Sequence, residues 1–104
     1  MIKEYNKLVR DKIPEIIKKS GKEPLIRIAE EREYEDFLVK KLYEELDELA
    51  EARNAEEIAD IFEVLQALAR SLGYSWQEIE KTAEKKKTQR GGFKEKIVLI
   101  SVKG

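Results

Sequence analysis

Two amphipathic helical patterns, separated by a short break, constrain the fold of this chain more than any other feature. Between residues 31 and 53 apolar side chains recur at steps of three and four, and a second stripe of the same period extends from Ile58 to Leu72. Asn54 interrupts the pattern and is suited to cap the second helix, which Gly73 would end. Because the connection is so short, we expect these two helices to pack as an antiparallel pair.

Shorter patterns predict two more helices. Residues 12–20 are expected to form a short helix, with Asp11 as its cap and Gly21 as its stop. Ser75, followed by glutamate three residues later, forms a capping box that predicts a third long helix ending at the sequence RGGF, residues 90–93.

Two short apolar segments predict strands at either end of the chain. Residues 24–29 and 96–102 are the candidates, and we expect them to pair in a small two-stranded β ribbon. The predicted fold is therefore mainly α, a helical bundle of an antiparallel helix pair plus a third long helix, with a small two-stranded β ribbon. We expect one domain, residues 1–104, because neither a linker nor an internal repeat divides the chain.

Charge and composition exclude several classes of function. With 21 basic and 22 acidic residues the net charge is −1, so no overall field attracts nucleic acid or an anionic membrane. No hydrophobic stretch resembles a signal peptide or a membrane span, which indicates a cytoplasmic protein. The chain has no cysteine and no histidine, which excludes disulfides, Cys/His zinc sites and imidazole bases. A core of this size is thin, and a homodimer or higher homo-oligomer would enlarge it.

Four acids on the two central helices are candidate metal ligands. Glu45 and Glu48 are three residues apart on the first helix, and Glu57 and Asp60 are three apart on the second, so each pair lies on one helix face. In helical projection Glu45 and Glu57 lie beside the apolar stripes. An ionised carboxylate in such surroundings must be protonated, paired with a base, or bound to a cation.

Two interpretations of these acids remain open from the residues alone. Hard oxygen donors without histidine or cysteine favour Mg²⁺, with Mn²⁺ as the alternative, in a cup of four carboxylates. The second interpretation is a solvated acidic surface, in which Glu57 completes a capping box three residues after Asn54.

The acidic motifs resemble a known family, the all-alpha nucleoside triphosphate pyrophosphatases of the MazG-like superfamily. The similarity is carried by EELDE, residues 44–48, by EIAD, residues 57–60, and by YNKLVRDKIPEII, residues 5–17, together with RGGF at 90–93. The two terminal motifs are similar to those of a subgroup described as house-cleaning pyrophosphatases for noncanonical nucleotides. Only eight residues separate Glu48 from Glu57, fewer than in many superfamily members.

The resemblance implies a chemistry and a set of site residues. It implies that Glu45, Glu48, Glu57 and Asp60 coordinate magnesium, with Glu44 as an accessory acid, and that Glu45 or Glu48 accepts a proton from the attacking water. The implied reaction converts a nucleoside triphosphate to the monophosphate and pyrophosphate.

Cations and aromatic residues elsewhere in the chain are candidates for substrate binding. A triphosphate needs positive charge from the protein, and a base can stack on an aromatic ring. The candidate phosphate-binding residues are Lys41, Arg90, Arg10 and Lys12, and the candidate stacking residues are Phe93, Tyr74 and Trp76. Most of them have a structural alternative: an ion pair with Glu45 for Lys41, an ion pair with Asp11 for Arg10, a helix stop for the glycines after Arg90, and core or dimer contacts for the aromatic rings.

Two functional hypotheses follow. The first is a Mg²⁺-dependent nucleotide pyrophosphohydrolase. The second is a non-catalytic helical module, a dimeric interaction or adaptor protein, whose acids are solvated or paired with lysines of another subunit. Mg²⁺ should stabilise the first protein and leave the second unchanged, because only the first binds the ion in its folded state.

Overall fold

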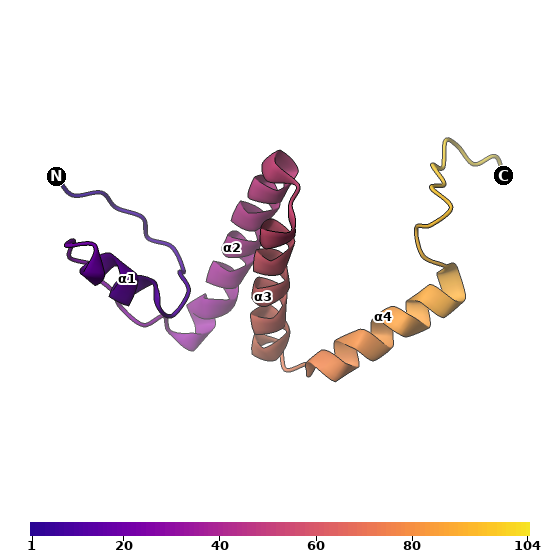
Figure 1. Cartoon of the computed structure of the whole chain (residues 1–104). Coiled ribbons are helices and arrows are strands. Elements are labelled where there is room, and N and C mark those ends of the chain that lie inside the picture. The colour runs from indigo at the N-terminus through magenta and orange to yellow at the C-terminus, as the bar shows by residue number, and fades with distance from the viewer.

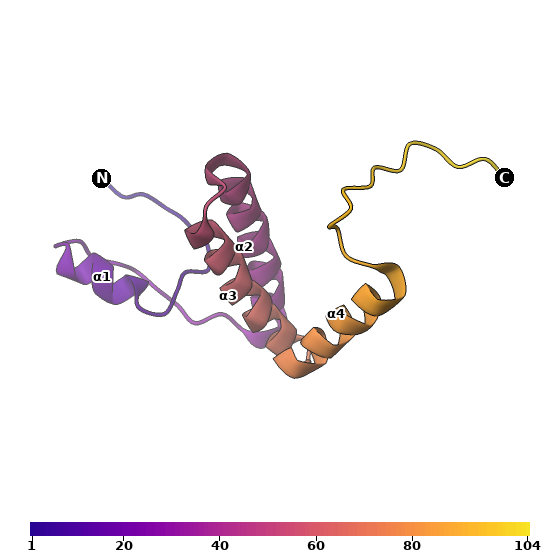
Figure 2. The same cartoon turned by 45° about the vertical axis from the view of Figure 1, so that its right-hand side comes forward.

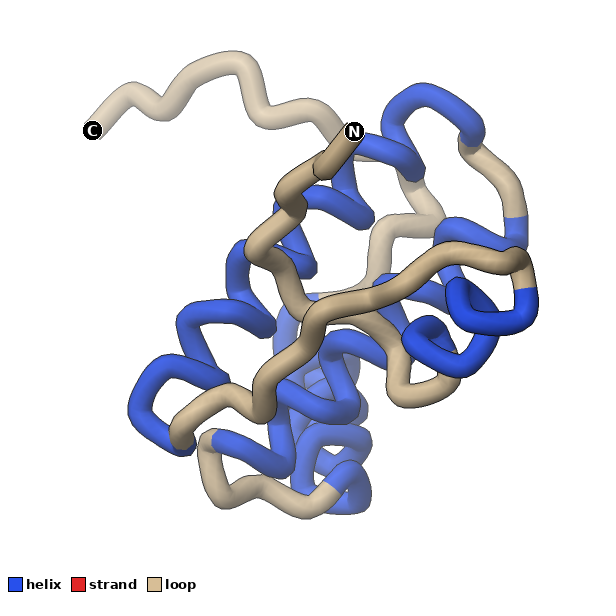
Figure 3. The backbone as a smooth tube through the Cα atoms, turned by 90° about the vertical axis from the view of Figure 1, so that its left-hand side faces the viewer, coloured by secondary structure: helices blue, strands red, loops and turns tan.

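A computed structural model describes all residues, 1–104, and contains four helices and no strand (Figures 1 and 3). The helices are α1, Ile13–Lys19; α2, Glu31–Ala52; α3, Ala55–Ser71; and α4, Trp76–Arg90. The predicted mainly helical class is therefore confirmed, as are three long helices at the expected places. None of the four helices has both the length and the apolar character needed to cross a bilayer.

The helices α2 and α3 pack against each other as the predicted antiparallel pair (Figure 1). Only two residues join them: Arg53, in the left-handed region at φ 49°, and Asn54, whose side-chain oxygen accepts a hydrogen bond from the Glu57 amide at 3.0 Å. Asn54 thus satisfies one of the free amides at the start of α3, as predicted. The small buried core of the chain contains Leu38 of α2 together with Val64 and Ala69 of α3.

Replacing the cap of α3 should destabilise the helix pair. We expect Asn54→Ala to lower the free energy of unfolding by about 1 kcal/mol, because an amide at the helix start loses its acceptor. In a domain of this size that corresponds to a melting temperature about 5 °C lower, measured by circular dichroism. Asn54→Ser is the matched control, since serine retains an acceptor, and should melt close to the unsubstituted protein. If Asn54→Ala melts at the same temperature as the unsubstituted protein, the assignment of Asn54 as the cap is wrong.

The helix α4 begins as predicted but does not pack along the helix pair. Ser75 and Glu78 form the capping box, with both side chain to amide hydrogen bonds at 3.2 Å. An edge-to-face contact between Phe62 and Trp76, 5.4 Å between ring centroids, fixes the junction between α3 and α4. Beyond this junction α4 leads away from α2 and α3 (Figures 1 and 2), and it contacts only α3.

The short helix α1 forms where it was expected, although its predicted cap is wrong. The N-cap position is Lys12 rather than Asp11, and no side chain caps the helix, whose first turn instead contains Pro14. Gly21, at φ 89°, follows the helix end as predicted. Since α1 packs against none of the other helices, its position depends on the loops on either side of it.

The expected β ribbon is not formed within the single chain. Neither 24–29 nor 96–102 adopts a strand, and the two segments lie on opposite sides of the molecule (Figures 1 and 2). The first segment is held near the start of α2 by Arg27, whose guanidinium donates two hydrogen bonds to Glu33 at 2.7 and 2.8 Å. This guanidinium and the Glu30 amide lower the pKa of Glu33 to about 2. The outward direction of α4 takes the second segment away from the first.

Candidate metal centre

Four carboxylates from two helices converge on one point beside the α2–α3 turn. Glu45 and Glu48 of α2, with Glu57 and Asp60 of α3, each place one oxygen atom within 4.8 Å of the other three. Three-residue spacing puts each pair on one helix face, and the two-residue turn places the last turns of α2 beside the first turns of α3. The four acids that the sequence singled out are therefore brought together.

The start of α3 stabilises negative charge, whereas the end of α2 does not. Glu57 lies in the first turn of α3, where the helix dipole favours an anion. Glu48 lies near the end of α2, where the dipole is negative and the last turn carries no basic residue. The helix dipole therefore offsets part of the cost of negative charge on α3 but gives the α2 acids no such stabilisation.

Burial adds to the electrostatic cost of the cluster. Glu45 is only 5% exposed and is the one buried charged residue in the chain. Its Oε2 atom and the Oε2 atom of Glu57 are both buried and have no hydrogen-bond partner. Burial raises the pKa of Glu45, and the nearby charges of Glu48 and Asp60 raise it further, while Lys41 opposes the shift. The cluster thus holds acceptor oxygens that the protein itself does not satisfy.

Three cations reach the cluster but do not neutralise it. Arg10 donates to Asp60 Oδ1 at 2.7 Å, and Lys7 donates to Glu44 Oε1 at 2.7 Å. The Lys41 ammonium lies 3.4 Å from Glu45 Oε1 and 3.5 Å from Glu44 Oε2. Counting Glu44 with the four clustered acids, five negative charges face three positive ones. The remaining two negative charges equal the charge of one divalent cation.

The donor set fits Mg²⁺ or Mn²⁺. All donors are carboxylate oxygens, the hard ligands that these ions prefer. Opposite ligands of a magnesium ion lie about 4.2 Å apart when each bond is about 2.1 Å. Oxygen atoms spread over at most 4.8 Å need only small side-chain adjustments to reach that spacing. A bound cation would supply a partner for the buried Oε2 atoms of Glu45 and Glu57, which have none in the protein.

The structure separates the predicted phosphate-binding residues into two groups. Lys41 and Arg10 lie at the cluster, and Arg10 pairs with Asp60 rather than with its neighbour Asp11. Lys12 is exposed and makes no ion pair. Arg90 ends α4, which leads away from the helix pair, so the single chain does not bring it to the carboxylates (Figure 2).

The aromatic residues proposed for base stacking also lie apart from the cluster. Trp76 packs against Phe62 at the α3–α4 junction. Tyr74 is half-exposed in the turn before α4, and Phe93 is almost fully exposed beyond its end.

Lys7 is a site residue that the sequence did not single out. It hydrogen-bonds to Glu44, and this contact and the charges of nearby glutamates raise its pKa, so its ammonium stays charged. A hollow of about 40 Å³ lies beside it, next to the carboxylates, and is lined by Asn6, Lys7, Leu8, Phe37, Lys40, Lys41 and Glu44. Three lysines around one hollow give this side of the cluster positive charge suited to phosphate oxygens.

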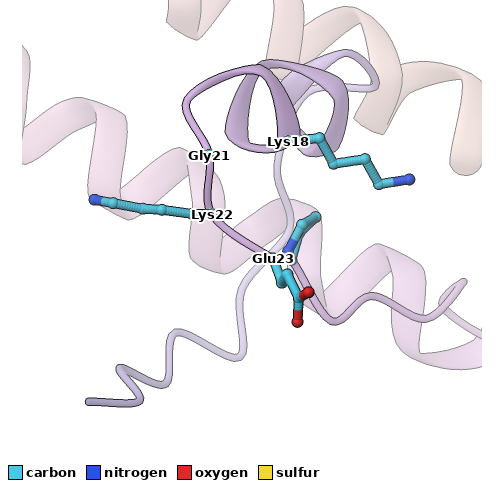
Figure 4. A pocket seen from close by; sticks show the side chains of 5 residues that line it. Lys18, Gly21, Lys22 and Glu23 are labelled. Atoms are coloured by element: carbon cyan, nitrogen blue, oxygen red, sulfur yellow. The ribbon is translucent and has the colours of Figure 1, made fainter.

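A larger hollow after α1 is a weaker candidate for a ligand site. Its volume is about 520 Å³, and it is lined by Lys18, Gly21, Lys22, Glu23 and Pro24. The Lys18 and Lys22 side chains point away from each other (Figure 4), and no hydrophobic residue lines the hollow. Small-molecule sites are mostly apolar with a few convergent polar groups, which this hollow lacks.

Comparison with known proteins provides one partial similarity. A protein of Mycolicibacterium smegmatis, described as uncharacterized, is 50% identical to this chain over 50 residues, which are 46% of this chain and 51% of that relative. The matched region is thus about half the length of the relative. No family model matches the chain, and no solved structure matches it.

Proposed function

We propose that this protein is a Mg²⁺-dependent nucleotide pyrophosphohydrolase, converting a nucleoside triphosphate to the monophosphate and pyrophosphate in house-cleaning of noncanonical nucleotides. The observation that carries the proposal is the group of four carboxylates within 4.8 Å, two of which have buried oxygens without a partner. Such groups are costly when ionised and unsatisfied. A divalent cation accounts for all four residues together, as the resemblance to the pyrophosphatase family implies.

The chain supplies residues for each part of the reaction. Mg²⁺ bound by Glu45, Glu48, Glu57 and Asp60 would coordinate triphosphate oxygens and lower the pKa of a water molecule. Lys7, Lys41 and Arg10, which contact the acids of the cluster or Glu44 beside it, would bind phosphate oxygens. Glu45 or Glu48 would accept the proton of the attacking water, and the raised pKa of Glu45 suits that role.

A turnover screen tests the proposal. The protein is incubated with Mg²⁺ and a panel of normal and modified nucleoside triphosphates, and monophosphate and pyrophosphate are separated by chromatography. Asp60→Asn should lower turnover at least about 100-fold, since even residues that only support metal ligands contribute 10- to 100-fold. Glu63→Gln, an exposed acid of the same helix, is the control and should leave turnover unchanged. Absence of turnover for every nucleotide would reject the enzymatic role.

The helical interaction module is the second candidate function, and the large exposed apolar surface favours it. Phe62 and Leu65 of α3 and its C-cap residue Leu72 are each more than a third exposed, as a surface that binds another protein would be. Both candidates include a homodimer or higher homo-oligomer. They differ in that the module needs neither Mg²⁺ nor nucleotide, so the turnover screen separates them.

A further inference from the structure

The single chain exposes far more surface than a compact protein of its mass. Its accessible surface is 10085 Å², whereas a folded monomer of 12.2 kDa is expected to expose about 6,000 Å². Its radius of gyration is 18.4 Å, against about 13 Å for a compact domain of this length. The excess of about 4,000 Å² per chain is well above the roughly 800 Å² that each partner buries in a standard interface.

Many of the exposed apolar side chains lie in two segments, residues 25–28 between α1 and α2 and residues 97–102 after α4, and on one helix face. In the C-terminal segment, residues 97–102, five apolar side chains are at least 75% exposed and no residue is charged. In the segment 25–28, Leu25 is fully exposed, and Ile26 and Ile28 are more than half exposed. On α3 and at its C-cap the exposed residues follow the helical period: Ile58, Phe62, Leu65 and Leu72.

Both segments also leave their backbone hydrogen-bonding groups free. No backbone hydrogen bond involves residues 24–29 or 97–102. Arg27 nevertheless fixes the first segment, through two hydrogen bonds to Glu33 and a contact of 5.7 Å with the Phe37 ring. Free backbone groups beside exposed apolar side chains are the features to which another strand adds.

The chemistry of these edges fits a second copy of this chain. Both segments have exposed apolar side chains and free backbone groups, so each can serve as the partner strand of the other. The two lie on opposite sides of a molecule 60 Å long. Two elongated copies placed antiparallel about a two-fold axis bring each segment of one copy to the other segment of its partner. Such an arrangement closes on itself as a dimer. A net charge of −1 presents no repulsion between copies.

We propose that two copies of this chain form a two-fold dimer in which residues 97–102 of each chain pair as a β-strand with residues 25–28 of the other. In this dimer the two-stranded β ribbon predicted from the sequence forms twice, each time between one strand from each chain. The apolar face of α3 supplies further area for the same interface. This dimer stands independently of any reaction at the carboxylate cluster.

Cysteine cross-linking tests which residues pair. The chain has no cysteine of its own, so Ile26→Cys can be mixed with a series of single variants at positions 97 to 100, each made separately. On oxidation, heterodimers of two 12.2 kDa chains should form strongly at alternate positions and weakly between them, because strand side chains alternate in direction. Thr88→Cys on exposed α4 is the control. Equal cross-linking at all positions, or none above the control, would overturn the strand pairing.

A charge placed in the C-terminal segment tests the contribution of the ribbon to assembly. Val98→Lys should raise the dimer dissociation constant at least about 100-fold in sedimentation measurements, because the lost apolar contact occurs twice by symmetry. Val98 is exposed in the single chain, so the variant should keep its helical circular dichroism. Thr88→Lys adds the same charge elsewhere and should dimerise normally. A monomeric unsubstituted protein, or a Val98→Lys dimer of unchanged affinity, would overturn the proposal.

Discussion

Glu45→Gln is expected to stabilise the metal-free protein and to remove most of the stabilisation that Mg²⁺ gives. The substitution keeps the shape of the side chain and removes a buried charge whose Oε2 atom has no partner. Its amide group brings a hydrogen-bond donor among carboxylate oxygens that lie within 4.8 Å of one another, while Lys41 retains Glu44 as a partner. An unsatisfied buried polar group costs about 1–3 kcal/mol, so the metal-free variant should unfold at a higher temperature.

Glu45→Gln should, by contrast, reduce the rise in melting temperature that Mg²⁺ causes. A ligand at 100 times its dissociation constant stabilises the folded state by about 2.7 kcal/mol, which raises the melting temperature of a domain this size by about 10 °C or more. Differential scanning calorimetry with and without Mg²⁺ should record this shift for the unsubstituted protein and little of it for Glu45→Gln. Glu51→Gln, an exposed acid on the same helix, is the control. If Glu45→Gln and Glu51→Gln respond alike to Mg²⁺, the metal site is wrong.

The stabilisation that Glu45→Gln gives the metal-free protein should depend on pH. The folded-state pKa of Glu45 lies above its value of 4.5 in the unfolded chain, so the folded protein binds this proton more tightly. Its ionisation therefore costs stability at neutral pH, and the cost disappears as the pH falls from the raised pKa to 4.5. The difference in melting temperature between Glu45→Gln and the unsubstituted metal-free protein should be largest at neutral pH and shrink across that range.

The features that the sequence predicted well depend on local interactions. The boundaries of α2 and α3 follow from the three- and four-residue apolar period, and Asn54, Ser75 and Gly73 act within one helix turn. The carboxylate cluster follows from the same local rules, because two helices joined by two residues must place their adjoining turns side by side. Only the short turn was needed to bring Glu48 near Glu57.

The features that the sequence did not predict depend on distant parts of the chain. The direction of α4 is set by the turn at Gly73 and by the contact of Phe62 with Trp76, neither of which a helical pattern specifies. The ribbon was expected from two strand-like segments, but this direction separates them. The pairing of Arg10 with Asp60 spans 50 residues in sequence, and nothing in the local pattern favours it over the adjacent Asp11.

Arg10→Met should strengthen Mg²⁺ binding and weaken nucleotide turnover. The guanidinium of Arg10 lies 2.7 Å from Asp60 Oδ1, on a carboxylate that the metal also needs. Without the Arg10 guanidinium, Asp60 Oδ1 has no competing partner and the full negative charge of Asp60 is available to Mg²⁺. Because the pair is partly exposed, its effect is at most about 1 kcal/mol, and the Mg²⁺ dissociation constant measured by calorimetry should fall about two- to fivefold.

The same substitution removes a cation from the place where triphosphate oxygens would bind. A hydrogen bond to a charged group contributes about 1.5–3 kcal/mol, so kcat/KM should fall roughly 10- to 100-fold. Lys3→Met removes a charge from the same terminal segment without an ion pair to the cluster and should change neither quantity. If metal affinity rises while turnover falls, Arg10 leaves Asp60 to bind phosphate when the substrate is present. A residue that only holds the N-terminal segment in place would not give these opposite changes. If both quantities fall together, Arg10 has only the structural role, because loss of a structural contact would disorder the metal site and the substrate site alike.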